Sequence, residues 1–246
     1  VDEETDLLAW PETAFPQAYW EHEFEYLYGT EEVRKIIDSF PQLRVITGLS
    51  SSRLFLEGDV LTKTARKFRQ GEGWYDNYNS AIEIEAGKKI DLHHKSKLVL
   101  GVEKIPFLQY LPIMKKLSIN LGGSSGGLGE DGSPTVFSTL QNHKIAPIIC
   151  YESIYGEYVT EYVRQGAQLL VIITNDGWWD NTPGYKQHLA YARLRAIETR
   201  RSIARSANTG ISAFIDQKGE LLQATDWWVE AAIKAELYLN NEQTFY

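Results

Sequence analysis

The chain has 246 residues, of which 43% are hydrophobic and 24% charged, the ordinary mixture of a globular protein with a sizeable core. Its formal net charge of -8 argues against a nucleic-acid binder, which needs a basic face to meet phosphates. No segment reaches the roughly 20 apolar residues that cross a bilayer. Residues 1–6 are acidic, unlike a signal peptide, and an apolar run follows almost at once. We therefore expect a fragment of a longer protein.

The first half of the chain predicts one helix and several short strands. Residues 30–40 place apolar side chains at helical spacing, and we expect Thr30 to cap that helix. Residues 80–85 alternate apolar and polar side chains, as a half-buried strand does. The other short runs predicted here are residues 6–10, 44–49 and 89–94.

The second half predicts strands alternating with helices. The expected strands are residues 135–140, 146–150, 167–174, 202–206, 212–216 and 231–237. The expected helices are residues 154–165 and 185–201. Such a mixture favours an α/β fold with helices outside a sheet. The glycine-rich stretch 122–133 predicts a loop, and it lacks the Gly-Lys-Ser/Thr ending of a phosphate-binding loop.

Glu12, Lys95 and Cys150 each come directly after an apolar run. Loops at strand ends are where a rigid sheet presents side chains to a substrate. Cys150 lies between a predicted strand and a predicted helix, and the positive end of a helix favours the nucleophilic thiolate. A nearby Lys95 would favour the thiolate further and stabilise an oxyanion, while Glu12 would carry the thiol proton.

Each of these residues also has a plain structural interpretation. Glu12 can cap the turn after Pro11, and Lys95 sits in Lys-Ser-Lys, which is usually a solvated edge. Cys150, the only cysteine, can be a small buried hydrophobic residue. The three residues are far apart in the sequence, so their spacing alone does not bring them together.

Metal and serine chemistry are disfavoured. His93 and His94 are neighbours, so in a strand they face opposite ways and cannot ligate one metal ion. The other three histidines are scattered, and the chain has no G-x-S-x-G motif for a serine nucleophile. We predict neither a metal nor a cofactor.

Five segments follow one another in a specific order along the chain. They are WPETAFP at 10–16, HHKSKLVLGVEKIPF at 93–107, PIICYES at 147–153, TNDGWW at 174–179 and the long segment at 187–216. Together they resemble the nitrilase, or carbon–nitrogen hydrolase, superfamily. They look most like its apolipoprotein N-acyltransferase branch.

The resemblance implies a nitrilase-like four-layer α-β-β-α sandwich, with residues 1–246 forming a single catalytic domain that lacks the family's first strand and helix and its flanking transmembrane helices. It implies a catalytic triad of Glu12, Lys95 and Cys150. Glu103 is implied as a second active-site glutamate, although LVLGVE stands here in place of the family's LVPFGE. The residues expected to contact substrate are Tyr151, Glu152, Asn175 and Trp178. For Asn175 a turn cap, and for Trp178 simple packing, remain open.

The implied reaction is acyl transfer in two steps, at the periplasmic face of a bacterial inner membrane. An acyl chain passes from a phospholipid to Cys150 as a thioester, and then to the N-terminal amine of a diacylglyceryl-cysteine apolipoprotein. The alternatives are a soluble amidase of the same superfamily, which uses water, and a non-catalytic interaction domain. The apolar segment 105–117 is either a membrane-facing arm beside the site or ordinary core.

Overall fold

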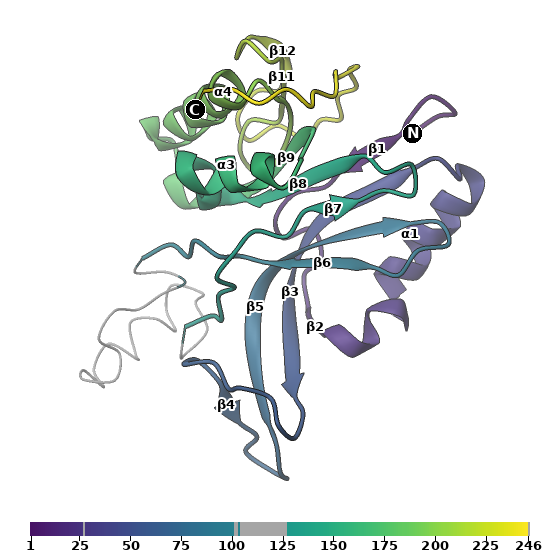
Figure 1. The fold of residues 1–246 in the computed structure, drawn as a ribbon, viewed down its shortest axis with the longest axis vertical. Helices are drawn as coiled ribbons and strands as arrows, with labels where there is room; N and C mark the ends of the chain where they lie inside the picture. Colours follow the sequence, from purple (N-terminus) through teal and green to yellow (C-terminus); the bar gives the residue numbers. More distant parts are fainter. Residues whose placement is uncertain (27, 101–102, 104–126, 246) are drawn as a thin grey trace.

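The computed structural model describes residues 1–26, 28–100, 103 and 127–245, and within these residues two β-sheets lie face to face (Figure 1). The strands of the first sheet are β1 Leu7–Ala9, β2 Ala18–Trp20, β3 Arg44–Phe55, β4 Arg66–Lys67, β5 Trp74–Glu85 and β6 Asp91–His94. Strand β3 pairs in parallel with β1 and β2 and antiparallel with β5, which also carries β4 and β6.

The second sheet has the order β12-β11-β10-β9-β8-β7. Its strands are β7 Phe137–Ser138, β8 Lys144–Ile149, β9 Leu169–Asn175, β10 Ser202–Asn208, β11 Ala213–Ile215 and β12 Leu221–Ala224. Strands β8, β9 and β10 are parallel, so their carboxyl ends share one edge of the sheet. That edge carries Cys150, the predicted nucleophile, and Asn175, which was expected to contact substrate, together with Asn208.

Helices cover the outer face of each sheet. The helical elements are η1 Glu21–Tyr26, α1 Tyr28–Ser39, η2 Cys150–Ile154, α3 Gly156–Arg164, η3 Asp176–Trp179 and α4 Pro183–Thr199. Figure 1 shows α1 against the first sheet, and α3 and α4 against the second. None of these described helices has the length and apolar character needed to cross a membrane.

Three apolar clusters fill the spaces between the layers, and strand alternation explains them. On β9, Leu170 and Ile172 point outward to α3 and α4, while Val171 and Ile173 point inward to the other sheet. The inner cluster unites both sheets, with Ile46 from β3 beside residues of β8 and β9. The third cluster lies between α1 and the outer face of the first sheet. The predicted α-β-β-α sandwich is confirmed.

Several predicted elements differ from the structure. Residues 231–237 do not form a strand, and side chains hold this segment instead: Lys234 pairs with Asp2 at 2.7 Å and Leu237 packs on the inner cluster. Thr30 lies inside α1 and donates a hydrogen bond to the Phe24 carbonyl at 2.8 Å, so it is not the helix cap.

Other differences concern element boundaries. The predicted helix 154–165 is divided into η2 and α3, and the predicted strand 135–140 shrinks to β7. Strand β2 was not predicted, because a run of three residues is too short to show a pattern. The outer halves of β3 and β5 were not predicted, because their polar side chains break the apolar pattern.

Candidate active site

Glu12 lies where the chain leaves β1 and passes over Gly48 of β3. The Gly48 amide donates to the Pro11 carbonyl at 3.1 Å. A Cβ added at Gly48 would lie 2.5 Å from both the Cα and the carbonyl carbon of Glu12, closer than real Cβ atoms approach. Glycine at this position therefore lets the Glu12 main chain lie directly on the sheet.

The Glu12 carboxylate is buried and held by donors from both sheets. Its Oε1 accepts hydrogen bonds from Lys95 Nζ at 3.0 Å and from Asn79 Nδ2 at 2.7 Å. Its Oε2 accepts from the Asn175 amide at 2.8 Å. The turn-cap interpretation of Glu12 does not describe these contacts, which fix the carboxylate between the sheets.

Lys95 follows β6 and is only 1% exposed, so it is not part of a solvated edge. Its Nζ donates to Glu103 Oε1 at 2.9 Å as well as to Glu12. Burial by itself lowers the pKa of Lys95, but the carboxylates of Glu12 and Glu103 raise it well above its ordinary value. The side chain is therefore a permanent cation.

Glu103 is held in place despite the altered sequence before it. Its Oε1 accepts from Lys95 Nζ and from Asn79 Nδ2, both at 2.9 Å, and its Oε2 accepts from the Val99 amide at 2.8 Å. Two carboxylates thus share one ammonium and one side-chain amide. This shared arrangement orients Lys95 Nζ between Glu12 and Glu103.

Cys150 lies at the junction of β8 and η2, buried, with its φ at +49°. Burial and the neighbouring Glu12 raise the pKa of its thiol to about 12, although Lys95 and a hydrogen bond of Thr174 act in the opposite direction. The expectation of a thiolate stabilised by a helix end is thus wrong for the resting protein. A short 3₁₀ segment intervenes before α3, and burial among negative charges keeps the thiol protonated.

Glu152 lies behind Cys150, fully buried. It accepts hydrogen bonds from the Ser96 amide at 2.6 Å and the Ile149 amide at 2.8 Å, and its Oε2 is 3.4 Å from His93 Nε2. Burial tends to raise its pKa, but His93 and the two amides hold it below the ordinary value. The structure thus places Glu152 as an anchor between the loop after Lys95 and the loop of the cysteine, away from any open surface.

The other residues expected to contact substrate occupy different surroundings. The Asn175 side chain accepts from the Gly177 amide and the Thr209 hydroxyl, both at 3.1 Å, so it caps η3. Tyr151 is partly buried and its ring meets that of Tyr155 edge-on at 5.6 Å. Trp178 is 59% exposed. The segment 105–117 and residues 122–126 of the glycine-rich loop lie outside the described residues.

Comparison of the sequence with known proteins shows the family to which the chain belongs. The model of the carbon-nitrogen hydrolase family matches residues 1–245. The chain belongs to the carbon–nitrogen hydrolase family. A protein named apolipoprotein N-acyltransferase in Chlorobaculum tepidum is 34% identical over 99% of this chain and 45% of its own length. One of the same name in Geobacter metallireducens is 30% identical over 98% of this chain and 42% of its own. The chain therefore spans less than half the length of these relatives.

Solved structures agree on the fold of this carbon–nitrogen hydrolase domain. Saccharomyces cerevisiae Nit3, a member of the nitrilase superfamily, superposes with a TM-score of 0.56 at 18% identity, over 92% of this chain and 74% of Nit3. An amidase from Nesterenkonia superposes with a TM-score of 0.55 at 14% identity, over 90% of this chain and 73% of its own. At such identities the likeness concerns the fold alone.

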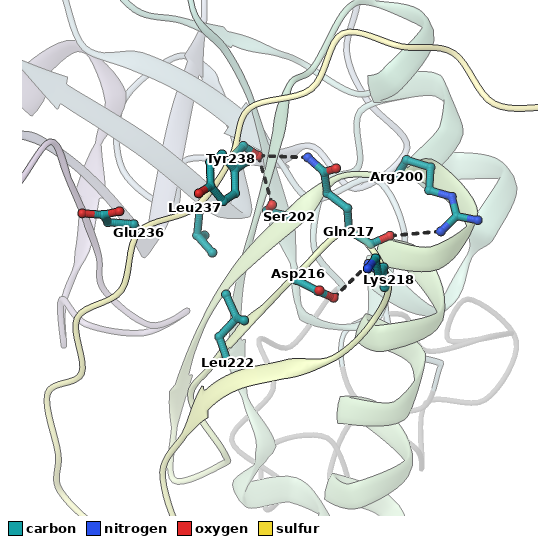
Figure 2. Close-up of a pocket in the computed structure, with 9 residues that line it drawn as sticks. All are labelled: Arg200, Ser202, Asp216, Gln217, Lys218, Leu222, Glu236, Leu237 and Tyr238. Atoms are coloured by element: carbon teal, nitrogen blue, oxygen red, sulfur yellow. Dashed lines mark hydrogen bonds between the residues drawn. The ribbon is translucent and has the colours of Figure 1, made fainter.

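Two cavities lie elsewhere in the carbon–nitrogen hydrolase domain. One of about 310 Å³ lies at the start of β10, lined by Ser202, Asp216 and Tyr238 among others (Figure 2). The other, about 770 Å³, runs between β1 and β10. Among the described residues, those lining the two cavities include none of the predicted site residues. The described part of the chain also contains no group of acidic, histidine or cysteine side chains that could hold a metal ion.

Sequence reasoning missed two residues of the site, Asn79 and Gly48. Asn79 donates to both carboxylates and lies one position before the predicted strand 80–85. Extending that strand's alternation would have placed Asn79 on the same face as Ala81, which packs between the sheets. Gly48 lay inside a predicted strand, where an isolated glycine signals the close approach of another backbone.

Proposed function

We propose that this chain is the catalytic domain of an apolipoprotein N-acyltransferase, with Cys150 as nucleophile, Glu12 as general base and acid, and Lys95 as the cation that stabilises the oxyanion. The observation that carries the proposal is the buried group of Glu12, Lys95 and Glu103, in which the charges of Glu12 and Lys95 act on the Cys150 thiol. The two relatives that the chain matches over nearly its whole length support the choice of reaction.

The electrostatics of the group favour proton transfer during the attack. With Cys150 protonated, Glu12, Glu103 and Lys95 together carry a net charge of about -1, and ionising the thiol alone would add another buried negative charge. Moving the thiol proton to Glu12 leaves the net charge unchanged. The thiol therefore loses its proton to Glu12 as the sulfur attacks, and no free thiolate accumulates beforehand.

In the first half-reaction the Cys150 sulfur attacks the ester carbonyl of a phospholipid. The C–S bond forms, and the developing oxyanion meets the Lys95 ammonium. The C–O bond then breaks, and Glu12 returns its proton to the departing glycerol oxygen. The products are a lysophospholipid and a thioester on Cys150.

In the second half-reaction the free amine of a diacylglyceryl-cysteine lipoprotein attacks the thioester. Glu12 accepts the amine proton and delivers it to the departing Cys150 sulfur. The amide bond forms and the resting thiol is restored. A thioester suits this step, because a thiolate is a better leaving group than an alkoxide. The proposed chemistry requires no cofactor.

Further parts of the proposal concern place and partners. We expect the active site to face the periplasmic surface of a bacterial inner membrane, within a longer protein that carries transmembrane helices. We also expect Tyr151 and the exposed Trp178 to contact the lipid substrates, with Trp178 at the rim.

The competing candidate is an amidase, the activity named for one structural neighbour. The molecule that accepts the acyl group distinguishes the two candidates: the acyltransferase uses an amine, and the amidase uses water. The chain, expressed with the flanking sequence of its gene, is incubated with phospholipid vesicles and a synthetic diacylglyceryl-cysteine peptide. The proposal expects the acyl chain on the peptide amine, with loss of transfer in Cys150→Ala. Release of free fatty acid with an unmodified peptide would instead favour hydrolysis.

A further inference from the structure

A second buried polar group, which the proposed mechanism does not use, lies behind Cys150. It comprises Asp176 at the start of η3, His188 on α4 and Arg205 on β10, with exposed fractions of 0%, 4% and 3%. Asp176 Oδ1 lies 2.8 Å from His188 Nδ1, and Arg205 donates to Asp176 Oδ2 at 2.5 Å. Burial raises the pKa of Asp176, but His188 and Arg205 bring it below its ordinary value, so the carboxylate is ionised.

This group reaches the main chain of Cys150 through His188. The ring Nε2 lies 3.1 Å from the Cys150 carbonyl oxygen and 2.9 Å from Ser153 Oγ. Ser153 Oγ itself donates to the same carbonyl at 2.7 Å. Because Cys150 has a φ of +49°, a conformation that residues other than glycine seldom adopt, its backbone needs such outside support.

The same carboxylate also reaches the Cys150 side chain through a second path. Thr174 donates to Asp176 Oδ1 at 3.0 Å, and the Thr174 hydroxyl also interacts with the Cys150 thiol. The Asp176 carboxylate thus acts on Cys150 at two points, on the carbonyl oxygen through His188 and on the sulfur through Thr174. The Asp176 side chain is closely packed against Gly210, since a Cβ added at Gly210 would lie 2.8 Å from the Asp176 Cβ.

The arrangement invites comparison with a Cys-His-Asp triad, and its geometry differs in one respect. In such a triad the second ring nitrogen faces the nucleophile. Here His188 Nε2 faces the Cys150 carbonyl oxygen and the Ser153 hydroxyl, and Nδ1 is committed to Asp176. His188 therefore holds the nucleophile's backbone and leaves proton transfer to Glu12.

We infer that Asp176 and His188 are positioning residues that orient the Cys150 sulfur toward Glu12 and Lys95. The inference rests on the proposed role of Cys150 as nucleophile, and it is independent of which acceptor takes the acyl group. If the backbone of Cys150 relaxes from its left-handed conformation, the sulfur moves relative to its base. Steps that need Glu12 then slow, while reactions that need only an accessible thiol do not.

The test compares two reactions of Cys150 in the same protein. One is acylation by p-nitrophenyl butyrate, which requires the base and the cation. The other is alkylation by iodoacetamide, which consumes the small thiolate fraction in equilibrium with solvent and forms no oxyanion, so neither group must be aligned with the sulfur in its transition state. His188→Leu removes both ring nitrogens, whereas His188→Gln keeps one amide that can donate near the position of Nε2.

We expect His188→Leu to lower the acylation rate at least about tenfold through kcat, with KM unchanged and alkylation within about threefold of wild type. His188→Gln should recover part of the loss. Leu189→Ala is the matched control, because Leu189 is buried on the same helix but packs in the cluster between α3, α4 and the second sheet. Leu189→Ala should lower the Tm about as much as His188→Leu does, but leave the acylation rate within about twofold of wild type. Ser153→Ala, which removes the other donor to the Cys150 carbonyl, tests the same support with a smaller change.

The inference is overturned if acylation and alkylation fall in parallel in the His188 and Ser153 variants, or if acylation keeps its wild-type rate. Failure of the proposed function looks different. In that case wild-type protein is acylated by the ester, and the His188 variants show the selective loss, but no acyl chain reaches a diacylglyceryl-cysteine peptide.

Discussion

Replacing Gly48 by alanine should misplace the base without touching any catalytic side chain. The new Cβ would lie 2.5 Å from the Glu12 Cα and closer still to its carbonyl oxygen, and ordinary contact begins at 3.4 Å, so the two segments must separate by at least about 0.9 Å. Neither segment moves freely. Gly48 is paired with Ala81 in the middle of β3, and Glu12 is bonded to Lys95, Asn79 and Asn175.

The expected loss follows from that displacement. A shift of about 1 Å in a reacting group can lower a catalysed rate about 100-fold. Overpacking of this kind also lowers the free energy of unfolding by about 1–3 kcal/mol, or about 2–12 °C in Tm for a chain of this size. Gly48→Ala should therefore stay folded at 25 °C and lose about 100-fold in kcat/KM for acylation by p-nitrophenyl butyrate.

Gly132→Ala is the matched control, since an added Cβ there has nothing within 4 Å. Acylation kinetics and thermal melting are measured on both variants. Gly132→Ala should resemble wild type in both. If Gly48→Ala keeps its acylation rate within about twofold at an unchanged Tm, then the close approach of Glu12 to β3 does not set the position of the base, and the reasoning fails.

Two further predictions concern buried charges. His94 lies 2.8 Å from Glu21 and 3.1 Å from Asp131, and although burial alone lowers its pKa, these carboxylates raise it to about 9. The protonated ring should contribute at most about 3 kcal/mol of stability below pH 6.5, and that contribution should vanish as the pH rises through 9. Chemical denaturation of wild type and His94→Gln at pH 6 and pH 9.5 measures it, and an equal difference at both pH values would contradict it. Lys95→Met should destabilise the fold by about 3–5 kcal/mol, because two buried carboxylates lose their cation. Adding Glu103→Gln should recover part of that loss, and a purely additive double variant would argue against the shared ion pair.

Local patterns predicted the layers well. The continuous apolar run of residues 167–174 and the helical spacing in residues 185–201 correspond to β9 and α4, whose side chains contribute to the clusters on either side of the second sheet. The pattern failed where contacts came from side chains at a distance. Residues 231–237 alternate like a strand, yet they form no strand in the structure. An ion pair of Lys234 and the packing of Leu237 hold the segment instead of strand hydrogen bonds.

The sequence likewise predicted one aspect of the site, the identity of its residues, and not another, their burial. The motif match supplied Glu12, Lys95, Glu103 and Cys150, and their reactive types suggested the chemistry. Burial was not readable from local sequence: Lys95 in a charged tripeptide is 1% exposed. Its environment depends on partners 83 and 8 positions away, and no short-range pattern encodes such distances.

The link between Asp176 and Cys150 was invisible for the same reason. It passes through His188, a residue 38 positions beyond the cysteine. Composition gives no sign of such a path, because a lone histidine on a helix is most often a surface or core residue. Only the three-dimensional contacts distinguish it.

The central claim is that Cys150 carries the acyl chain as a thioester. The direct measurement is mass spectrometry of the protein after incubation with a phospholipid of one defined acyl chain, followed by acid quenching and proteolysis. The account predicts the acyl mass on the peptide that contains Cys150, lost on treatment with neutral hydroxylamine and absent in Cys150→Ala. An acyl adduct on another residue, together with full transfer activity in Cys150→Ala, would contradict it.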